Sequence, residues 1–268
     1  MVNISAALPS TAYGGNKTLY AQELRSIAER HPCWQHPFFA YLESGNVRAA
    51  QLASLLKNYD AHAGLLRRLL LQAASIMPEE AAGFVLENIR NEYGNGNSDH
   101  RHQLQLLDVA AKIGASQEQL DTIPLAKGVL QYIATIPAYY APSQSFNVLN
   151  SQDMLQAGTL NFAEDNINAA AFSAGAITAT EIMAINEFKS MQKTFAQFGL
   201  ENHIWFNHVT VEVEHSDESI DLAYYFVAKH NKETQVLNGF TKVLDANIHL
   251  YEGFLSSMQK HERLQQHT

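Results

Sequence analysis

The chain has 268 residues, of which 46% are hydrophobic and 17% charged, and its formal net charge is −9. This composition is that of a folded globular protein, and the length is sufficient to bury a substantial core. The acidic balance argues against non-specific nucleic-acid binding, because such binding depends on Lys and Arg side chains that neutralise phosphates.

Apolar residues recur at helical spacing along most of the chain after an irregular N-terminal leader that contains Pro9 and two glycines. The predicted helices, in chain order, are one from Leu19 to about His31, a short one after Pro37, 48–76, 79–92, one capped by Ser98 that ends at Gly114, one opened by Ser116, one helix within 120–145, 151–198 with a break near Gly158, 202–230 and 231–259.

This pattern contains no strand–helix alternation, no internal repeat and no low-complexity linker. We therefore predict an all-α fold with about seven or more helices in one domain. The domain is expected to span residues 19–262, between a leader at 1–18 and a short tail at 263–268.

Cys33 is the only cysteine, so an internal disulfide and a multi-thiolate zinc or iron–sulfur site are excluded. A nucleophilic thiol is conceivable there, but a small buried hydrophobic side chain is the expected role. The N-terminus lacks a basic start followed by an apolar run, and no apolar stretch approaches the roughly 20 residues that a membrane span needs. These features predict a cytoplasmic protein without contact to a membrane.

The segment His208-Val-Thr-Val-Glu212-Val-Glu-His215 is the most informative one for function. On a helix, positions i, i+4 and i+7 fall within roughly 60° of one another, which predicts a stripe of two imidazoles and a carboxylate. Such donors without thiolate suit iron, manganese or zinc. The valines alternate with polar residues as in a strand, and a strand would turn His215 away from His208; the helical neighbours on both sides favour the helix.

Further metal ligands are expected from other helices, and Glu92 and His102 are candidates on either side of Gly94 and Gly96. A spacing of ten residues rotates two side chains about 80° apart on a continuous helix. A local unwinding at the glycines would bring both side chains to one centre.

The segment Asn91-Glu92-Tyr93-Gly94-Asn95-Gly96 followed by His102 resembles the Glu-Tyr-Gly-x-Gly…His element of the haem-oxygenase-like di-iron oxidases and oxygenases. The same family carries a His-x3-Asp-x2-His element, which His208, Glu212 and His215 match with Glu in place of Asp. It also places a Glu ligand on a helix between the two elements, and Glu181 is similar to it. The run His36-Pro37-Phe38-Phe39 and the helix around Tyr59 resemble the first helices of the family, so that the resemblance spans roughly residues 30–230.

This resemblance implies a haem-oxygenase-like helical bundle with two Fe(2+) ions per chain and O2 as co-substrate. Glu92, His102 and Glu181 would hold one iron, next to a second iron held by His208, Glu212 and His215. The implied reaction is N-oxygenation, desaturation or C–C cleavage of a small amino-acid-like metabolite within natural-product biosynthesis, by a chain that forms a homodimer. Three alternatives stay open: a fatty-acid-cleaving or desaturating oxidase, a non-catalytic iron-binding protein, and a metal-free thiaminase-like enzyme on the same scaffold.

Substrate contacts are less well defined by the sequence. His62 is expected to be a core histidine or a substrate contact, and Lys189 is a second weak candidate. Arg67 and Arg68 could pair with a substrate carboxylate or lie on the outer face of their helix. Glu164 and Glu187 compete with Glu181 as ligands, although Glu187 lies six positions after Glu181 and therefore off its face.

Overall fold

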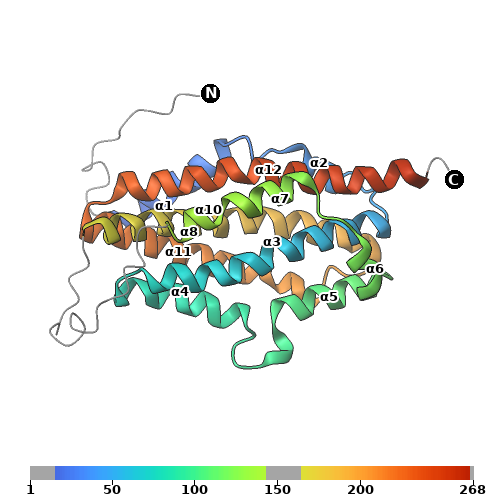
Figure 1. The fold of residues 1–268 in the computed structure, drawn as a ribbon, viewed down its shortest axis with the longest axis horizontal. Coiled ribbons are helices and arrows are strands. Elements are labelled where there is room, and N and C mark those ends of the chain that lie inside the picture. Colours follow the sequence, from blue (N-terminus) through green and yellow to red (C-terminus); the bar gives the residue numbers. More distant parts are fainter. Residues whose placement is uncertain (1–15, 143–163, 266–268) are drawn as a thin grey trace.

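The computed structural model describes residues 16–142 and 164–265, with their side chains except those of residues 164–165, 207–215 and 261–265. The helices are α1 (Lys17–Arg30), α2 (Pro37–Leu42), α3 (Ala49–Ser75), α4 (Glu79–Glu92), α5 (His102–Lys112), α6 (Gln117–Thr122), α7 (Lys127–Thr135), α8 (Pro137–Tyr140), α10 (Glu164–Phe195), α11 (His208–His230) and α12 (Glu233–Gln265) (Figure 1). The described residues form no strand. The predicted all-α bundle of seven or more helices is confirmed.

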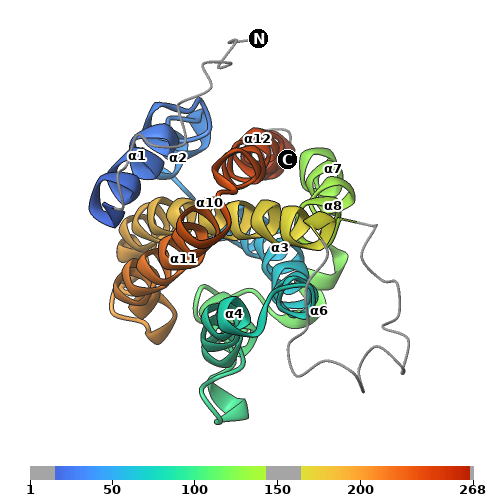
Figure 2. The ribbon, with the colours of Figure 1, turned by 90° about the vertical axis from the view of Figure 1, so that its left-hand side faces the viewer.

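The long helix α10 is the centre of the bundle. It packs most extensively against α12 and α11, and it also contacts α1, α2, α3 and α8. The end-on view in Figure 2 shows these helices arranged around it, with α4 held on the far side of α3 and α11. A side chain on α10 can therefore face the interior between α3, α4 and α12.

Two glycines allow α10 and α12 to approach each other closely. A Cβ atom added at Gly175 would lie 1.9 Å from the carbonyl oxygen of Val236, and one added at Gly239 would lie 1.9 Å from the carbonyl oxygen of Phe172. Real Cβ atoms do not come so near to a backbone oxygen, so only glycine fits at either position. This contact fixes the distance between the two helices that form the main part of the core.

The helix starts follow local chemistry that is visible in the sequence. Asn16 caps α1 by accepting a hydrogen bond from the Leu19 amide at 3.2 Å, and Ser116 opens α6 with a capping box to Gln119. Pro37 occupies the first turn of α2, where the missing amide proton has no cost. The predicted starts near 19, 37 and 116 are therefore confirmed.

Several predicted helix boundaries are wrong. The helix expected from 202 begins at His208 after a 3-10 turn, and the one expected to end at 259 continues to Gln265. Ser98 does not cap the helix that ends before Gly114; Asn97 caps a single 3-10 turn at 98–100, and α5 begins at His102. The segment 120–145 contains two short helices, α7 and α8, instead of one, because Pro137 starts a new first turn after Ile136. The predicted break at Gly158 lies outside the described residues.

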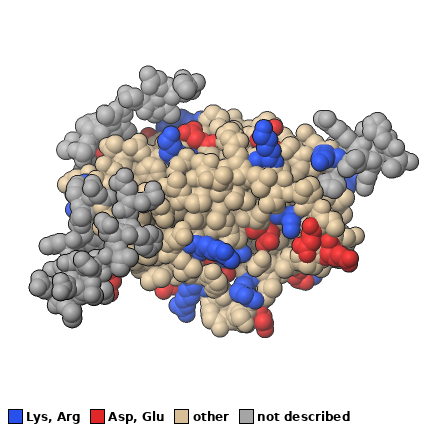
Figure 3. All heavy atoms as spheres, in the orientation of Figure 1, with Lys and Arg blue, Asp and Glu red and all other residues tan. Residues whose placement is uncertain are grey.

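The core is rich in aromatic residues, among them Phe38, Tyr251 and Phe254, which are at most 1% exposed and lie with ring centroids 5.4–6.2 Å apart. No described helix is long and apolar enough to cross a lipid bilayer. On the face drawn in Figure 3, Lys and Arg side chains are interspersed with Asp and Glu. That face therefore does not form the continuous basic surface that phosphate backbones require.

Candidate functional site

The chain between α4 and α5 brings Glu92 and His102 together. Glu92 is the last residue of α4, and His102 is the first residue of α5. Gly94, at φ +87°, turns the chain between them, and a Cβ atom there would lie 2.1 Å from the carbonyl oxygen of Asn97. Glu92 Oε1 lies 2.9 Å from His102 Nδ1. The local unwinding predicted at the glycines is present, and it juxtaposes a carboxylate and an imidazole that a continuous helix would separate.

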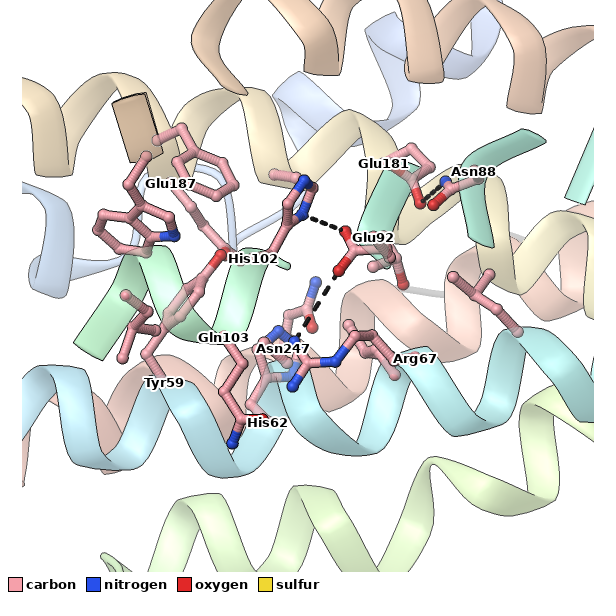
Figure 4. A pocket seen from close by; sticks show the side chains of 18 of the residues that line it. Tyr59, His62, Arg67, Asn88, Glu92, His102, Gln103, Glu181, Glu187 and Asn247 are labelled. Atoms are coloured by element: carbon pink, nitrogen blue, oxygen red, sulfur yellow. Dashed lines mark hydrogen bonds and ion pairs between the residues drawn. The ribbon is translucent and has the colours of Figure 1, made fainter. Parts of the chain in front are cut away.

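These two side chains open into a cavity between α3, α4, α5, α10 and α12 (Figure 4). Its empty space amounts to about 770 Å³, including the part of the mouth that is open to solvent. Its polar lining consists of Tyr59, His62, Arg67, Asn88, Glu92, His102, Gln103, Tyr140, Thr180, Glu181, Glu187 and Asn247. A concave site with a few convergent polar groups has the form of a small-molecule site.

Glu181 reaches the same cavity from α10 and is 7% exposed. Its Oε1 accepts a hydrogen bond of 2.8 Å from the side-chain amide of Asn88, which is itself buried on α4. Asn88 lies four residues before Glu92, hence on the same face of α4, and so orients Glu181 beside the Glu92–His102 pair. Figure 4 shows Glu181, Glu92 and His102 on one side of the cavity.

The segment 208–215 is helical, forming the first two turns of α11. The helical interpretation is therefore confirmed and the strand interpretation is excluded, which places His208, Glu212 and His215 on one face of α11. The side chains of these three residues lie outside the described part of the structure. The turn that precedes them, Ile204–Asn207, contacts α5, and its Trp205 lines the cavity, so α11 begins next to the site.

A further carboxyl group, that of Glu187, lines the cavity from α10. Burial raises its pKa to about 7, although hydrogen bonds from Tyr251 and Tyr59 lower it in part. The Tyr251 hydroxyl donates to Glu187 Oε1 at 2.6 Å. Glu187 therefore holds a carboxyl proton near neutral pH inside the cavity. On sequence, Glu187 competes with Glu181 as a ligand but lies off its helical face.

The raised pKa of Glu187 predicts a stability difference that depends on pH. Between pH 4.5 and 7 the unfolded chain ionises this carboxyl while the folded protein keeps it protonated, so the folded state loses up to about 3 kcal/mol. Glu187→Gln removes this loss and keeps an acceptor for Tyr251. In iron-free protein, urea unfolding should show the variant more stable than the wild type at pH 8 and nearly equal at pH 4. A difference that is the same at both pH values would contradict the assignment.

His62 lies in the middle of α3, is 4% exposed and lines the cavity. Its Nδ1 is buried without a hydrogen-bond partner. Burial lowers its pKa to about 3, so the ring is neutral at physiological pH. The rings of Tyr59 and Tyr132 meet it edge to face at centroid distances of 5.6 and 5.0 Å. Of the two roles expected for His62, a satisfied core histidine is not what the structure shows, because this nitrogen lacks a partner.

Lys189, Arg68 and His100 do not line the cavity. Lys189 is exposed and is not among the lining residues, so the geometry gives no support for the suggested substrate contact. Arg68 is exposed, whereas its neighbour Arg67 lines the cavity. His100 is exposed, as its position two residues before His102 indicated. The Glu164 side chain lies outside the described residues.

Cys33 has a histidine and a carboxylate in line with it, but the arrangement is not that of a reactive thiol. His31 Nδ1 lies 3.1 Å from the sulfur, and His31 Nε2 lies 3.3 Å from Asp245 Oδ1. However, Cys33 is fully buried, and burial raises the pKa of its thiol to about 12. A thiol that stays protonated is not a nucleophile. The expected role as a small buried side chain is confirmed.

A protein-family model described as iron-containing redox enzyme matches residues 55–248, which is 194 of the 268 residues. The chain belongs to this family. The matched region contains Glu92, His102, Glu181 and the α11 stripe. Among curated proteins, none matches the chain.

Two solved structures of a CADD-like protein of unknown function from Nostoc punctiforme PCC 73102 are similar to this chain. Each shares 14% sequence identity with it. One has a TM-score of 0.66 and covers 90% of this chain and 98% of that chain; the other has a TM-score of 0.63 and covers 92% and 97%. At this identity the likeness shows the fold alone.

The donors on the described side of the cavity fit iron in their chemistry. Glu92 and Glu181 offer hard anionic oxygens, and His102 offers an imidazole nitrogen, with Glu92 and His102 already at 2.9 Å from each other. No three His, Cys, Asp or Glu side chains within the described ranges cluster closely enough to hold an ion by themselves. The first turns of α11 follow the turn Ile204–Asn207, which contacts α5 beside the cavity, so that this helix begins close enough to add further donors.

The cavity also has polar lining residues that no motif in the sequence indicates. Asn88, Gln103 and Asn247 line the cavity, and of these Asn88 and Asn247 are buried. Asn88 could have been found, since it precedes Glu92 by one helical turn. Asn247 could not, because its helix shows no local pattern that distinguishes an amide at the cavity from one at the surface.

Proposed function

We propose that this protein is a non-haem di-iron oxidase or oxygenase that uses O2 to oxidise a small amino-acid-like metabolite. The observation that carries the proposal is the convergence of Glu92 and His102, 2.9 Å apart, in a cavity that Glu181 also lines. The helical stripe His208, Glu212 and His215 at the start of α11 would complete the donor set. Six donors from α4, α5, α10 and α11 are the number that carboxylate-rich di-iron sites in helical bundles use.

Two ferrous ions held by these residues would supply electrons that activate O2, and O2 would be the oxidant of the substrate. The protein's own residues would bind and orient the substrate in the cavity. Trp205, Tyr59 and Phe188 pack against one another at its edge, with ring centroids 5.3–6.1 Å apart, and so limit the entry of water. Glu187 can give or take a proton at its carboxyl group near neutral pH.

Ferrous-iron binding under anaerobic conditions tests this proposal. The iron-free wild-type protein should take up about two irons per chain. His102→Ala should take up about one iron per chain, because the first iron loses its imidazole ligand and keeps only the carboxylates of Glu92 and Glu181. The exposed His100→Ala is the matched control and should behave as the wild type.

The same preparation separates the rival functions. O2 consumption by the ferrous protein that accelerates with particular small molecules is expected of an oxidase and not of an iron-storage or iron-buffering protein. A wild-type chain that binds no iron, or a His102→Ala chain that binds as much as the wild type, would refute the proposed site. A metal-free enzyme on this scaffold would give the first of these results.

A further inference from the structure

The cavity contains a positive charge that its protein neighbours satisfy only in part. The Arg67 side chain is 11% exposed, and its closest carboxylate contact is Glu92 Oε2, 3.9 Å from Arg67 Nη1. No described side chain accepts a hydrogen bond from Arg67 within 3.5 Å, although a guanidinium carries five N–H donors. Burial raises the pKa of the Asp60 carboxyl, and the charge of Arg67 and a hydrogen bond from Gln103 lower it in part, but Asp60 Oδ1 is buried without a hydrogen-bond partner and so accepts none from Arg67. Most of the Arg67 donors are therefore available to a molecule in the cavity.

Metal binding would leave the Arg67 guanidinium with still fewer acceptors. A Glu92 carboxylate that donates its oxygens to an iron has less charge to offer Arg67. A buried guanidinium without an anionic partner is costly, and a carboxylate matches its two parallel N–H bonds better than other small groups do. A carboxylate on the bound molecule would satisfy both the charge and the donors.

A second, uncharged polar subsite lies on the same helix. His62 is 4% exposed, its Nδ1 has no partner, and the aromatic rings of Tyr59, Tyr132 and Phe254 surround it. Asn247, 3% exposed on α12, lines the same cavity. Figure 4 shows His62 across the cavity from Glu181. Because burial keeps the imidazole neutral, the group that satisfies it should be uncharged and able to form hydrogen bonds.

We propose that Arg67 and His62, assisted by Asn247, are the specificity-determining residues of this cavity. They select a small molecule that carries a carboxylate at one end and an uncharged hydrogen-bonding group, such as a hydroxyl or an amide, at the other. This inference rests on the proposed function, in that the molecule so bound is the substrate of the oxidation.

Calorimetric titration with matched probes tests the proposal. The probes are ω-hydroxy acids with chains of four to six carbons, the corresponding alkyl acids, and the corresponding diols, added to the protein loaded anaerobically with ferrous iron and also to the iron-free protein. At least one chain length of hydroxy acid should bind saturably to the wild type and more tightly than the alkyl acid and the diol. Arg67→Met should weaken binding of that acid by about tenfold or more and remove the preference over the diol. His62→Phe should instead remove the preference of hydroxy acid over alkyl acid.

Arg68→Met is the control, because Arg68 is the exposed neighbour of Arg67 on α3 and should leave every affinity within about twofold of the wild type. The proposal is overturned if no acid of any length binds better than its diol, if Arg67→Met binds the acids as the wild type does, or if Arg68→Met weakens them equally. Since the iron-free arm measures binding without oxidation, a protein that passes this test but takes up no iron would contradict the proposed function and leave the recognition intact.

Discussion

His215→Ala is expected to lose one of two irons and to lower substrate-dependent O2 consumption by more than about 100-fold, since replacing even the outer partners of metal ligands costs about 10–100-fold. His215 lies on the same face of α11 as His208 and Glu212, so its removal would leave the second iron with two protein donors from this helix. The helical fold should persist, because α11 is held by its packing against α10, α4 and α1. Iron content after anaerobic loading, O2 uptake and circular dichroism measure the three quantities.

Asp217→Ala is the matched control for this variant. Asp217 lies two residues further along α11, and it pairs at the surface with Arg25 at 2.5 Å. Loss of such a surface pair changes the free energy of unfolding by at most about 1 kcal/mol and should leave iron content unchanged. An unaltered iron content in His215→Ala would remove α11 from the metal site. A loss of helical signal in this variant would instead show that His215 is needed for folding.

Gly175→Ala should destabilise the protein by about 3 kcal/mol or more, because an added Cβ atom would lie 1.9 Å from the carbonyl oxygen of Val236. A backbone atom of α12 cannot yield as the end of a flexible side chain does, so α10 and α12 must separate. Since α10 carries both Glu181 and Glu187, the cavity should be distorted as well. Thermal unfolding should show a fall of roughly 6 °C or more.

Gly83→Ala, the same substitution at an exposed site, should instead raise the stability of the protein. Gly83 lies exposed within α4, and an added Cβ atom would have nothing within 4 Å. Ala has the higher helix propensity, so this variant should be more stable by about 0.5–1 kcal/mol. Equal effects of the two substitutions would show that the close approach of α10 and α12 is not what sets the cost at Gly175.

Most of the fold could be predicted from the sequence because the helices carry long apolar stripes and because Pro, Gly and capping residues mark their ends. The hardest segment was 208–215, where alternating valines imitate a strand. It is helical because it continues into the long amphipathic stretch to His230, and because the described bundle contains no strand with which it could pair. The boundary at Ser98 is wrong for a different reason: Asn97 caps only a single 3-10 turn, and Arg101, with ψ 137°, separates that turn from α5.

The composition of the cavity was only partly predictable. Glu92 and His102 were found by a motif, and the glycine turn explains why they meet. Glu187 and Glu181 lie on different faces of α10. However, both are three residues from Ala184, at about 60° on either side of it. Because Ala184 is the middle of the cavity-facing stripe, both carboxyl groups border the same space.

Arg67 and Arg68 show where sequence reasoning has no basis for a choice. The two are adjacent and chemically identical, and the apolar pattern of α3 runs on both sides of them. Only the packing of α4 and α5 against α3 decides that Arg67 faces the cavity and Arg68 the solvent. His62 is similar, because the lack of a partner for its Nδ1 depends on which rings surround it.

A crystal structure of the anaerobically loaded ferrous protein, with anomalous data at the iron absorption edge, tests the proposed centre most directly. Two neighbouring peaks are expected in the cavity, both within reach of Glu92 and Glu181, one coordinated by His102 and the other by His208, Glu212 and His215 on α11. Iron located elsewhere, or a loaded protein whose cavity shows no anomalous peak, would contradict this account.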